Sequence, residues 1–272
     1  MRVNMHTHSV YCDGKDRPEE MIQTALEKGF TILGFSGHGF SPYDTASMSA
    51  EHTRRYIDEI NALKQKYQDR ITIFLGIEQD STCRIPSKDP YEYVIGSVHF
   101  VEKDGVFRSI DYSREELCSI LEEWYDGDFR KLAADYYAEV ARQARFEEVD
   151  IIGHLDLLTK YNEDESFLSF SDPVYLKLAE QCIAAIGTEP VYEVNTGAIA
   201  RGYRKTPYPH RTLLEILHAF GAKIQLNSDC HNRKDLDCGF EEALQLIRSC
   251  GFTCLHILKD GDFVPVELDA FH

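Results

Sequence analysis

Short apolar segments of strand length alternate with longer segments of helical periodicity along the whole chain, and this alternation most restricts the fold. Seven segments rich in β-branched and other apolar residues lie at 2–5, 31–36, 71–76, 93–98, 150–153, 191–195 and 223–227. Most are separated by segments whose apolar residues recur every three to four positions. These lie at 18–28, 52–67, 113–123, 129–146, 172–186, 210–220 and 240–249. Such alternation predicts parallel βα units.

Parallel βα units build either an open doubly wound sheet or a closed barrel. Open sheets that bind nucleotides carry a glycine-rich loop after a strand, and no GxGxxG or GxxxxGK[ST] pattern follows any of the seven segments. A length of 272 residues is ordinary for one α/β barrel. We therefore predict one domain over residues 1–272, an α/β fold with a seven-stranded TIM-like (β/α) barrel.

Residues able to bind a metal ion follow the ends of nearly all the predicted strands. They are His6, His8, Asp13, His38, Glu78, His99, His154, Asp229 and His231. The carboxyl ends of barrel strands converge on one face, where active sites are built, so residues far apart in sequence meet there. We predict a metal site at that face.

Each of these residues taken singly has an ordinary explanation. A buried histidine is more often a hydrogen-bonded core residue than a ligand. Glu78 can pair with an arginine such as Arg84, and Asp13 in Cys12-Asp13-Gly14 suits a turn. Nine such residues at one barrel mouth, however, are not explained by core packing or turns, so the joint pattern favours metal binding.

The mixture of donor types indicates which ions to expect. Imidazole with carboxylate, and without thiolate, suits Zn²⁺, Mn²⁺ or Fe²⁺ better than Ca²⁺ or Mg²⁺. Nine donors suffice for two or three ions, with at least one carboxylate bridging. Paired ions about 3.5–4 Å apart serve phosphoester hydrolysis. The residues therefore predict a phosphoesterase with two to three divalent ions.

A basic segment after residues 191–195 offers candidates for binding phosphate. It contains Arg201, Arg204 and Lys205 in a chain whose net charge is −17. The arginine fork matches phosphate oxygens bidentately. We predict that these three residues bind the substrate phosphate, with Lys160 as a further candidate. An ordinary solvated loop is the alternative.

Composition narrows the partners and the compartment. A net charge of −17 with no evident basic face counts against nucleic acid, and no apolar run approaches the ~18 residues of a membrane span. Eight cysteines without a CxxC pair, and no signal-peptide pattern, indicate free thiols in a reducing compartment. We expect a cytoplasmic protein whose partner is a small phosphomonoester.

Taken together, the motifs resemble those of the PHP (polymerase and histidinol phosphatase) superfamily, and within it the monofunctional histidinol-phosphatases. The motifs are His6-Thr7-His8 with Cys12-Asp13-Gly14, Gly37-His38, Gly76-Ile77-Glu78, Ser97-Val98-His99, Gly153-His154-Leu155-Asp156, Glu193-Val194-Asn195-Thr196, Tyr208-Pro209 and Ser228-Asp229-Cys230-His231. The similarity spans almost the whole chain in the family's order. It implies a distorted seven-stranded barrel with a trinuclear site.

The resemblance also implies how the ligands divide among the ions. The implied groups are His6, His8, Glu78 and Asp229; Glu78, His99 and His154; and Asp13, His38 and His231. Many relatives carry a histidine one residue after Asp13, where this chain has Gly14. The third ion therefore depends on Asp13. Without that ion, His38 and His231 are expected to donate hydrogen bonds to phosphate directly.

The activity implied by the resemblance is hydrolysis of L-histidinol phosphate to L-histidinol and phosphate, a step of histidine biosynthesis. Asp229, Glu78 and His231 are the expected catalytic residues, and a carboxylate such as that of Asp229 can help to move protons. The alternative is a PHP-type phosphoesterase that acts on another small phosphoester, such as a nucleotide. A metal-binding module without activity is less compatible with a nearly complete ligand set.

Overall fold

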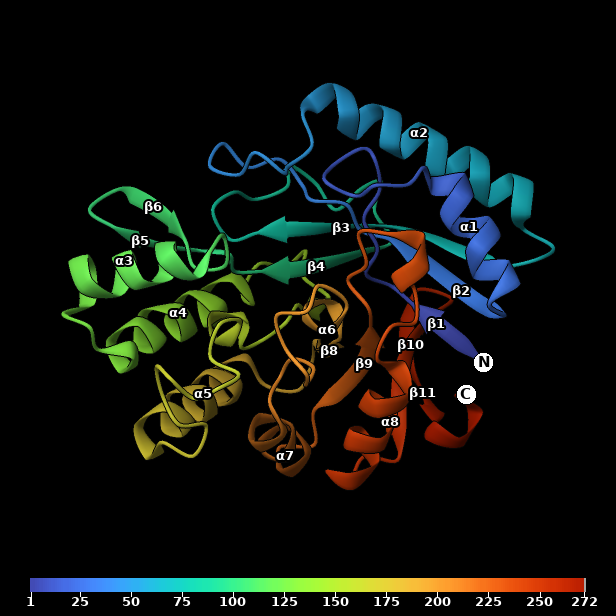
Figure 1. Ribbon diagram of the computed structural model, residues 1–272. Coiled ribbons are helices and arrows are strands. Elements are labelled where there is room, and N and C mark those ends of the chain that lie inside the picture. Colours follow the sequence, from blue (N-terminus) through green and yellow to red (C-terminus); the bar gives the residue numbers. More distant parts are fainter. Residues whose placement is uncertain (272) are drawn as a thin grey trace.

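Seven parallel strands form the framework of the computed structural model, which describes residues 1–271. Their order in the sheet is β1 (Arg2–Asn4), β2 (Phe30–Phe35), β3 (Thr72–Asp80), β4 (Tyr93–Ser97), β7 (Ile151–Ile152), β8 (Val191–Asn195) and β9 (Lys223–Asn227). The sheet curls until β9 returns beside β1 (Figure 1). Beyond these two strands, Thr7 and Cys230 form a parallel bridge, and the His8 N–H donates to the Cys230 carbonyl at 2.9 Å. The predicted barrel is thus confirmed as a nearly closed one.

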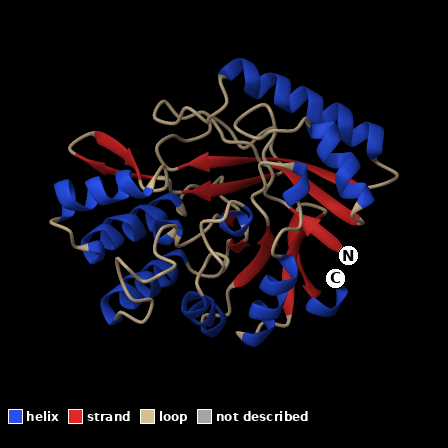
Figure 2. Ribbon diagram, viewed as in Figure 1, coloured by secondary structure: helices blue, strands red, loops and turns tan. Residues whose placement is uncertain are grey.

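Helices cover the outer side of the sheet (Figure 2). They are α1 (Pro18–Glu27), α2 (Ala50–Tyr67), α3 (Arg114–Tyr125), α4 (Phe129–Gln143), α5 (Pro173–Ile186), α7 (Arg211–Ala219) and α8 (Phe240–Ser249). The short helix α6 (Gly197–Ala200) instead follows the carboxyl end of β8, beside Asp229. The longer helices bury one apolar stripe each, as their periodicity predicts; α7 buries Leu213, Leu214 and Leu217. The Asp172 carboxylate caps α5 by accepting from two backbone N–H groups of its first turn.

An aromatic side chain fills the barrel interior just below the predicted metal ligands. Tyr93 is fully buried, and its hydroxyl donates to the carbonyls of Met5 and Phe35. A Cβ atom added at Gly34 or Gly76 would lie 2.3 or 2.2 Å from the tyrosine side chain. Glycine is needed at both positions because the Tyr93 side chain lies directly against their backbone. The barrel floor is therefore a packed layer.

Two antiparallel hairpins were not predicted from the strand pattern. One joins β5 (Phe100–Lys103) to β6 (Val106–Ser109), and the other joins β10 (Cys254–Lys259) to β11 (Asp262–Glu267). Each hairpin turns at an Asp-Gly pair with positive φ. The φ angles are 52° and 80° at residues 104 and 105, and they are 53° and 91° at residues 260 and 261. Asp-Gly is a strong hairpin signal, so this information was present in the sequence. Short 3-10 turns at Leu157–Thr159, Arg233–Asp235 and Leu268–Ala270 complete the elements.

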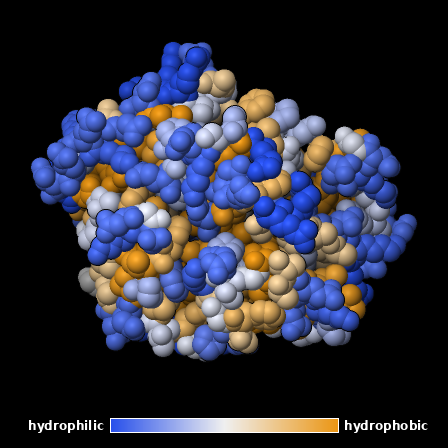
Figure 3. All heavy atoms as spheres, turned by 180° about the vertical axis from the view of Figure 1, so that it is seen from behind, coloured by the Kyte–Doolittle hydropathy of each residue, from blue (hydrophilic) through white to orange (hydrophobic). Residues whose placement is uncertain are grey.

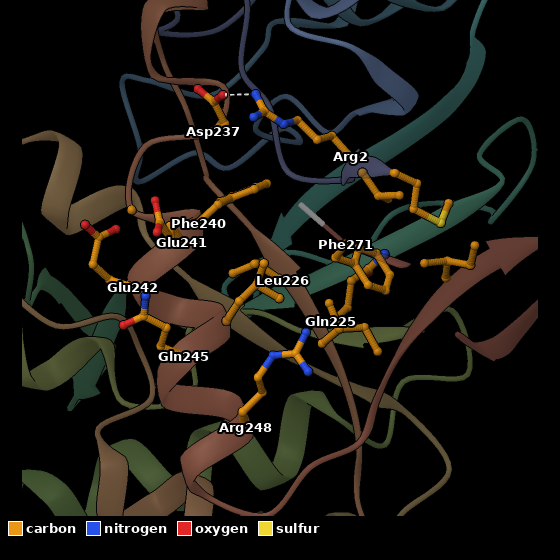
Figure 4. A pocket seen from close by; sticks show the side chains of 16 residues that line it. Arg2, Gln225, Leu226, Asp237, Phe240, Glu241, Glu242, Gln245, Arg248 and Phe271 are labelled. Carbon is orange, nitrogen blue, oxygen red and sulfur yellow. Dashed lines mark hydrogen bonds and ion pairs between the residues drawn. The ribbon is translucent and has the colours of Figure 1, made fainter. Parts of the chain in front are cut away.

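A cavity of about 600 Å³ lies at the seam between β1 and β9 (Figure 4). The helix α8 with the residues just before it, the strand β10 and Phe271 line its other sides. Met1 also lines it, and the Met1 ammonium donates to the Ala270 carbonyl. The N-terminal end is marked in Figure 1. No predicted site residue lines this cavity, so its size alone does not make it the reaction site.

Hydrophilic residues cover much of the face shown in Figure 3, with apolar residues visible between them. Among the described residues, no helix combines the length and the apolar character needed to cross a membrane.

Candidate metal centre

All nine predicted metal-binding residues lie together at the carboxyl ends of the barrel strands. Three of them, His6, His8 and Asp13, follow β1, and two, Asp229 and His231, follow β9. They fall into three groups of closely spaced donor atoms: His6, His8 and Asp229; Glu78, His99 and His154; and His8, Asp13, His38 and His231. In each group the donor atoms lie within 4.8 Å of one another. These groups nearly reproduce the division implied by the resemblance.

The Glu78 carboxylate is the centre of the arrangement. It lies inside β3, which continues four residues beyond its predicted end, and its side chain is 1% exposed. Its Oε2 atom is 3.2 Å from His6 Nε2 and 3.4 Å from His8 Nε2. Its Oε1 atom is 3.0 Å from His154 Nε2 and 3.6 Å from His99 Nε2. Each oxygen therefore faces a different set of imidazoles, as a bridging carboxylate does.

The first group, together with Glu78 of the second group, leaves lone pairs unsatisfied inside the protein. Asp229 Oδ1 lies 3.1 Å from His8 Nε2 and 3.6 Å from His6 Nε2. His6 Nε2, His8 Nε2 and Glu78 Oε2 are buried and have no hydrogen-bond partner. Buried polar atoms in native proteins are normally paired, so three orphaned atoms that converge need a common partner. Imidazole nitrogen and carboxylate oxygen are the donors that divalent transition ions take, so the residues fit such ions.

The third group contains Asp13, and the backbone next to it leaves no room for a side chain at position 14. Asp13 Oδ2 lies 3.1 Å from His231 Nε2, and Asp13 Oδ1 lies 3.7 Å from His38 Nε2. At Gly14, an added Cβ atom would lie 2.4 Å from the Ser9 backbone nitrogen. A side chain therefore does not fit at position 14 with this backbone. Asp13 instead brings a carboxylate to the two histidines.

Burial and mutual charge set the protonation of these groups in the metal-free protein. Burial, reinforced by the neighbouring His231 and His38, lowers the pKa of His8 to about 3. Burial alone would raise the pKa of Asp229 and of Glu78, but Arg201 beside Asp229 and the histidines around both hold each well below its usual value. At neutral pH the site thus offers a neutral imidazole and two carboxylates, the forms that bind metals.

Two further carboxylates contact the ligand histidines, and sequence reasoning gave neither a role. Asp80 Oδ2 lies 3.1 Å from His99 Nδ1, and Glu193 Oε1 lies 2.6 Å from His6 Nδ1. Two signals were available: Asp80 is two residues from Glu78 on the same strand, and Glu193 opens the Glu-x-Asn-Thr motif. Carboxylates of this kind fix the tautomer and orientation of a ligand histidine.

A second cavity, of about 310 Å³, opens over the metal-binding residues. Arg201 and Lys160 supply its cations, and Asp44 and Asp111 add carboxylates. The Arg201 guanidinium lies 3.1 Å from Asp229 Oδ2. Lys160 Nζ donates to the Asp111 carbonyl at 2.7 Å. The predicted phosphate-binding role of Arg201 and Lys160 is therefore compatible with their positions.

Arg204 and Lys205, unlike Arg201 and Lys160, are not part of the lining of this cavity, so their predicted role in binding phosphate gains no support from it. Arg204 is 3% exposed, donates to Thr159 Oγ1 at 2.7 Å and pairs with Glu163 at 3.3 Å. The Lys205 backbone N–H also donates to Glu163. The Arg204 guanidinium is held by these partners, so it joins two loops and does not reach into the cavity.

The ordinary explanation for Glu78 also fails. Arg84 pairs with Glu148 at 2.7 Å, on the outside of the molecule. Among the described residues, every ion pair of Glu78 is with a histidine, and none is with an arginine.

Comparison with known proteins decides the family. A protein-family model of the PHP domain matches residues 4–197. The chain belongs to the PHP family. A curated Deinococcus radiodurans protein named "Probable histidinol-phosphatase" is 32% identical over 260 residues, which cover 90% of this chain and 92% of that one. The matched family region contains seven of the nine candidate ligands and ends before Asp229 and His231.

Two solved structures share the fold of this PHP protein. A Listeria monocytogenes protein superposes with a TM-score of 0.78 over 89% of this chain and 99% of that one, at 22% identity. The histidinol phosphate phosphatase of Lactococcus lactis, solved with zinc, L-histidinol and phosphate, superposes with a TM-score of 0.70 over 97% of this chain and 98% of that one, at 20% identity. Both confirm the architecture.

Proposed function

We propose that this PHP protein is a histidinol-phosphatase, a phosphoric monoester hydrolase that converts L-histidinol phosphate to L-histidinol and phosphate in histidine biosynthesis. The observation that carries the proposal is the convergence of three orphaned donor atoms, on His6, His8 and Glu78, at the base of a cavity that also holds Arg201. The naming of the Deinococcus relative and the ligands of the Lactococcus structure support the choice of substrate.

The nine candidate ligands are proposed to hold two to three divalent ions, Zn²⁺, Mn²⁺ or Fe²⁺. Bound there, such ions lower the pKa of a coordinated water toward ~7 and offset negative charge on the phosphate and the leaving oxygen. Glu78 suits the bridging position because its two oxygens face different donor groups. The third group is the most exposed of the three, since the Asp13 side chain is 36% exposed.

The protein's own cations are proposed to bind the substrate phosphate. Arg201 lies at the cavity with its guanidinium held by Asp229, by the Asp229 carbonyl at 3.1 Å and by His231 Nδ1 at 2.9 Å. These contacts fix the guanidinium before substrate arrives, so its charge is already oriented toward the transferring phosphoryl group. Lys160 lies 4.7 Å from the centre of the Tyr203 ring and lines the same cavity.

Proton transfer to the leaving alkoxide is assigned to the groups beside the ions. Asp229 contacts Arg201 through Oδ2 and faces His6 and His8 through Oδ1. His231 Nε2 lies 3.1 Å from Asp13 Oδ2. These two residues join the deep part of the site to its more exposed part, so they are placed to pass a proton between water in the cavity and the reacting oxygens.

The lining of the cavity suits the amine and the ring of L-histidinol phosphate. Asp44 lines it with a carboxylate, and Phe100, Tyr112 and Tyr203 line it with aromatic rings, whereas the Asp111 carboxylate is paired with Lys160 at 3.3 Å. L-histidinol phosphate carries an ammonium group and an imidazole. A nucleoside monophosphate has no ammonium group to pair with the Asp44 carboxylate. The composition of the cavity therefore favours the amino alcohol phosphate over the nucleotide alternative.

Phosphate release tests the substrate assignment. L-histidinol phosphate, p-nitrophenyl phosphate and a nucleoside monophosphate are compared on protein reconstituted separately with Zn²⁺, Mn²⁺ and Fe²⁺. We expect kcat/KM for L-histidinol phosphate to exceed the other two by orders of magnitude. Equally slow turnover of all three would leave a phosphoesterase and overturn the substrate. Preference for the nucleotide would favour the alternative.

A further inference from the structure

The Glu-x-Asn-Thr motif supplies a buried carboxylate that belongs to none of the three donor groups. The Glu193 side chain is completely buried at the centre of β8. Its Oε1 accepts from His6 Nδ1 at 2.6 Å and from Asn227 Nδ2 at 3.0 Å. Its Oε2 accepts from the His154 backbone N–H at 2.9 Å and from Asn195 Nδ2 at 2.9 Å. Four donors from three strand ends and β8 itself therefore meet on one carboxylate.

The contact with His6 decides which nitrogen of that ring is free. The Glu193 carboxylate accepts the Nδ1–H, so the lone pair of the neutral ring lies on Nε2. Nε2 is the atom that faces Glu78 and Asp229 and has no hydrogen-bond partner. A carboxylate behind a ligand histidine also raises the basicity of the ligating nitrogen. Glu193 thus prepares His6 to bind an ion.

The same carboxylate positions a residue of the second donor group. The His154 backbone N–H is held by Glu193 Oε2, and the ring Nε2 of that residue lies 3.0 Å from Glu78 Oε1. Asn195, the other donor to Oε2, also lies 3.3 Å from Asp229 Oδ2. The Glu193 carboxylate therefore supports His6 of the first group and His154 of the second group. The Nε2 atoms of both rings also lie beside the Glu78 carboxylate.

We propose that Glu193 is a positioning residue shared by the first two ion sites, so that its carboxylate strengthens ion binding in both groups. The proposal rests on the function proposed above only in requiring that these donors bind metal ions. Glu193 is not part of the cavity lining and is completely buried. It therefore acts through His6 and His154 and does not touch the substrate.

Asp80 offers a matched control, because it supports only one ligand. Its Oδ2 accepts from the His99 backbone N–H at 2.9 Å and lies 3.1 Å from His99 Nδ1. Its Oδ1 accepts from the Thr82 backbone N–H. Asp80 is nearly as buried as Glu193, at 5% exposure, but reaches only the second group. Removing its charge is expected to weaken one ion alone.

The test is titration of the metal-free protein with Co²⁺, read by its visible absorption and by competition with a chromophoric chelator. The variants are Glu193→Gln and Asp80→Asn. For Glu193→Gln we expect both binding steps to weaken by a factor of about 10–100, the range for loss of a carboxylate behind a ligand, with a changed Co²⁺ spectrum. For Asp80→Asn we expect one step to weaken and the other to stay within a few-fold of wild type.

Weakening of only one step by Glu193→Gln, or unchanged affinity and spectrum, would overturn this shared role. Circular dichroism of each metal-free variant checks the fold. If Glu193→Gln does not fold, Glu193→Asp retains the charge but shortens the side chain, and the same loss at both steps is expected. Because no substrate is present, the result stands apart from the identity of the phosphoester. A wild-type protein that binds no Co²⁺ would instead refute the metal site itself.

Discussion

Replacing Glu78 with glutamine tests the bridging role most severely. The amide keeps one oxygen and replaces the other by an NH₂ group, which cannot bind a metal ion. Whichever way the amide turns, its NH₂ faces either His6 and His8 on one side or His99 and His154 on the other, at the 3.0–3.6 Å distances now spanned by carboxylate oxygens. One ion must therefore lose a ligand.

The expected size of the effect follows from what one ion contributes. An ion that stabilises transition-state charge is worth several kcal/mol, and each 1.36 kcal/mol corresponds to a tenfold change in rate. A loss of about 4 kcal/mol therefore lowers kcat/KM about 10³-fold. Steady-state phosphate release and metal analysis of the Glu78→Gln variant measure both consequences.

The control is the same substitution at Glu148, which pairs with Arg84 on the surface. Exposed pairs contribute at most about 1 kcal/mol, so Glu148→Gln should leave kcat/KM and metal content unchanged. If Glu78→Gln kept its full metal content and a kcat/KM within a few-fold of wild type, the bridging assignment would be refuted.

Three other predictions follow from individual contacts. Arg201→Ala should raise KM and lower kcat/KM for phosphoesters with little loss of stability. Arg204→Ala should instead lower the free energy of unfolding by about 2 kcal/mol, because the buried guanidinium donates to Thr159 and pairs with the partly exposed Glu163. Urea denaturation and steady-state kinetics of both variants separate the two effects, and equal increases in KM would contradict the assignment. Asp44→Asn, at the cavity, should reduce kcat/KM about tenfold for L-histidinol phosphate and leave that for p-nitrophenyl phosphate unchanged; equal losses for both substrates would contradict a role of Asp44 in binding the amine. In the metal-free protein burial opposes the charge on His99, but Asp80 and Glu78 prevail and raise its pKa to about 9. This folded-state pKa lies above the unfolded value of ~6.5. Protonated His99 therefore stabilises the folded metal-free protein fully below pH ~6.5, and this stabilisation is lost as the pH rises through about 9. Denaturation of chelator-treated protein should show that loss, and His99→Asn should reduce it.

The barrel was predictable for two reasons. Strand-like and helix-like apolar patterns alternate along the whole chain, and metal-binding residues follow most of the predicted strands. The strand β3 shows where periodicity was insufficient. Its prediction ended at Gly76, since Glu78 and Asp80 are polar, yet β3 continues to Asp80 and every residue from Leu75 on is buried. Residues at the carboxyl end of a barrel strand are polar where they form the site. The apolar pattern therefore stops before the strand itself ends.

The choice among basic residues could not be made from sequence. Arg201 and Arg204 stand three residues apart in one segment, but their partners come from different parts of the chain. Arg204 is held by Thr159, 45 residues away, and its guanidinium also lies 4.5 Å from the centre of the Tyr208 ring. Only the folded structure shows which side chain has such partners and which one faces the cavity.

Gly14 is a case in which the sequence raised a question and the structure answers it. The chain departs there from the motif of many relatives, which left the third group in doubt. The closeness of the Ser9 backbone leaves no room for a side chain, and Asp13 faces His38 and His231 instead. A backbone contact of this kind has no signature in a single sequence.

The most direct test of the central claim is the number of metal ions per chain. Protein reconstituted with Zn²⁺ or Mn²⁺ and freed of excess ion is analysed by inductively coupled plasma mass spectrometry, beside the His6→Ala and His8→Ala variants. We expect two to three ions per chain in the wild type, at least one fewer in each variant, and phosphatase activity that is lost with the ions. Fewer than one ion per chain in a fully active wild-type protein would contradict it.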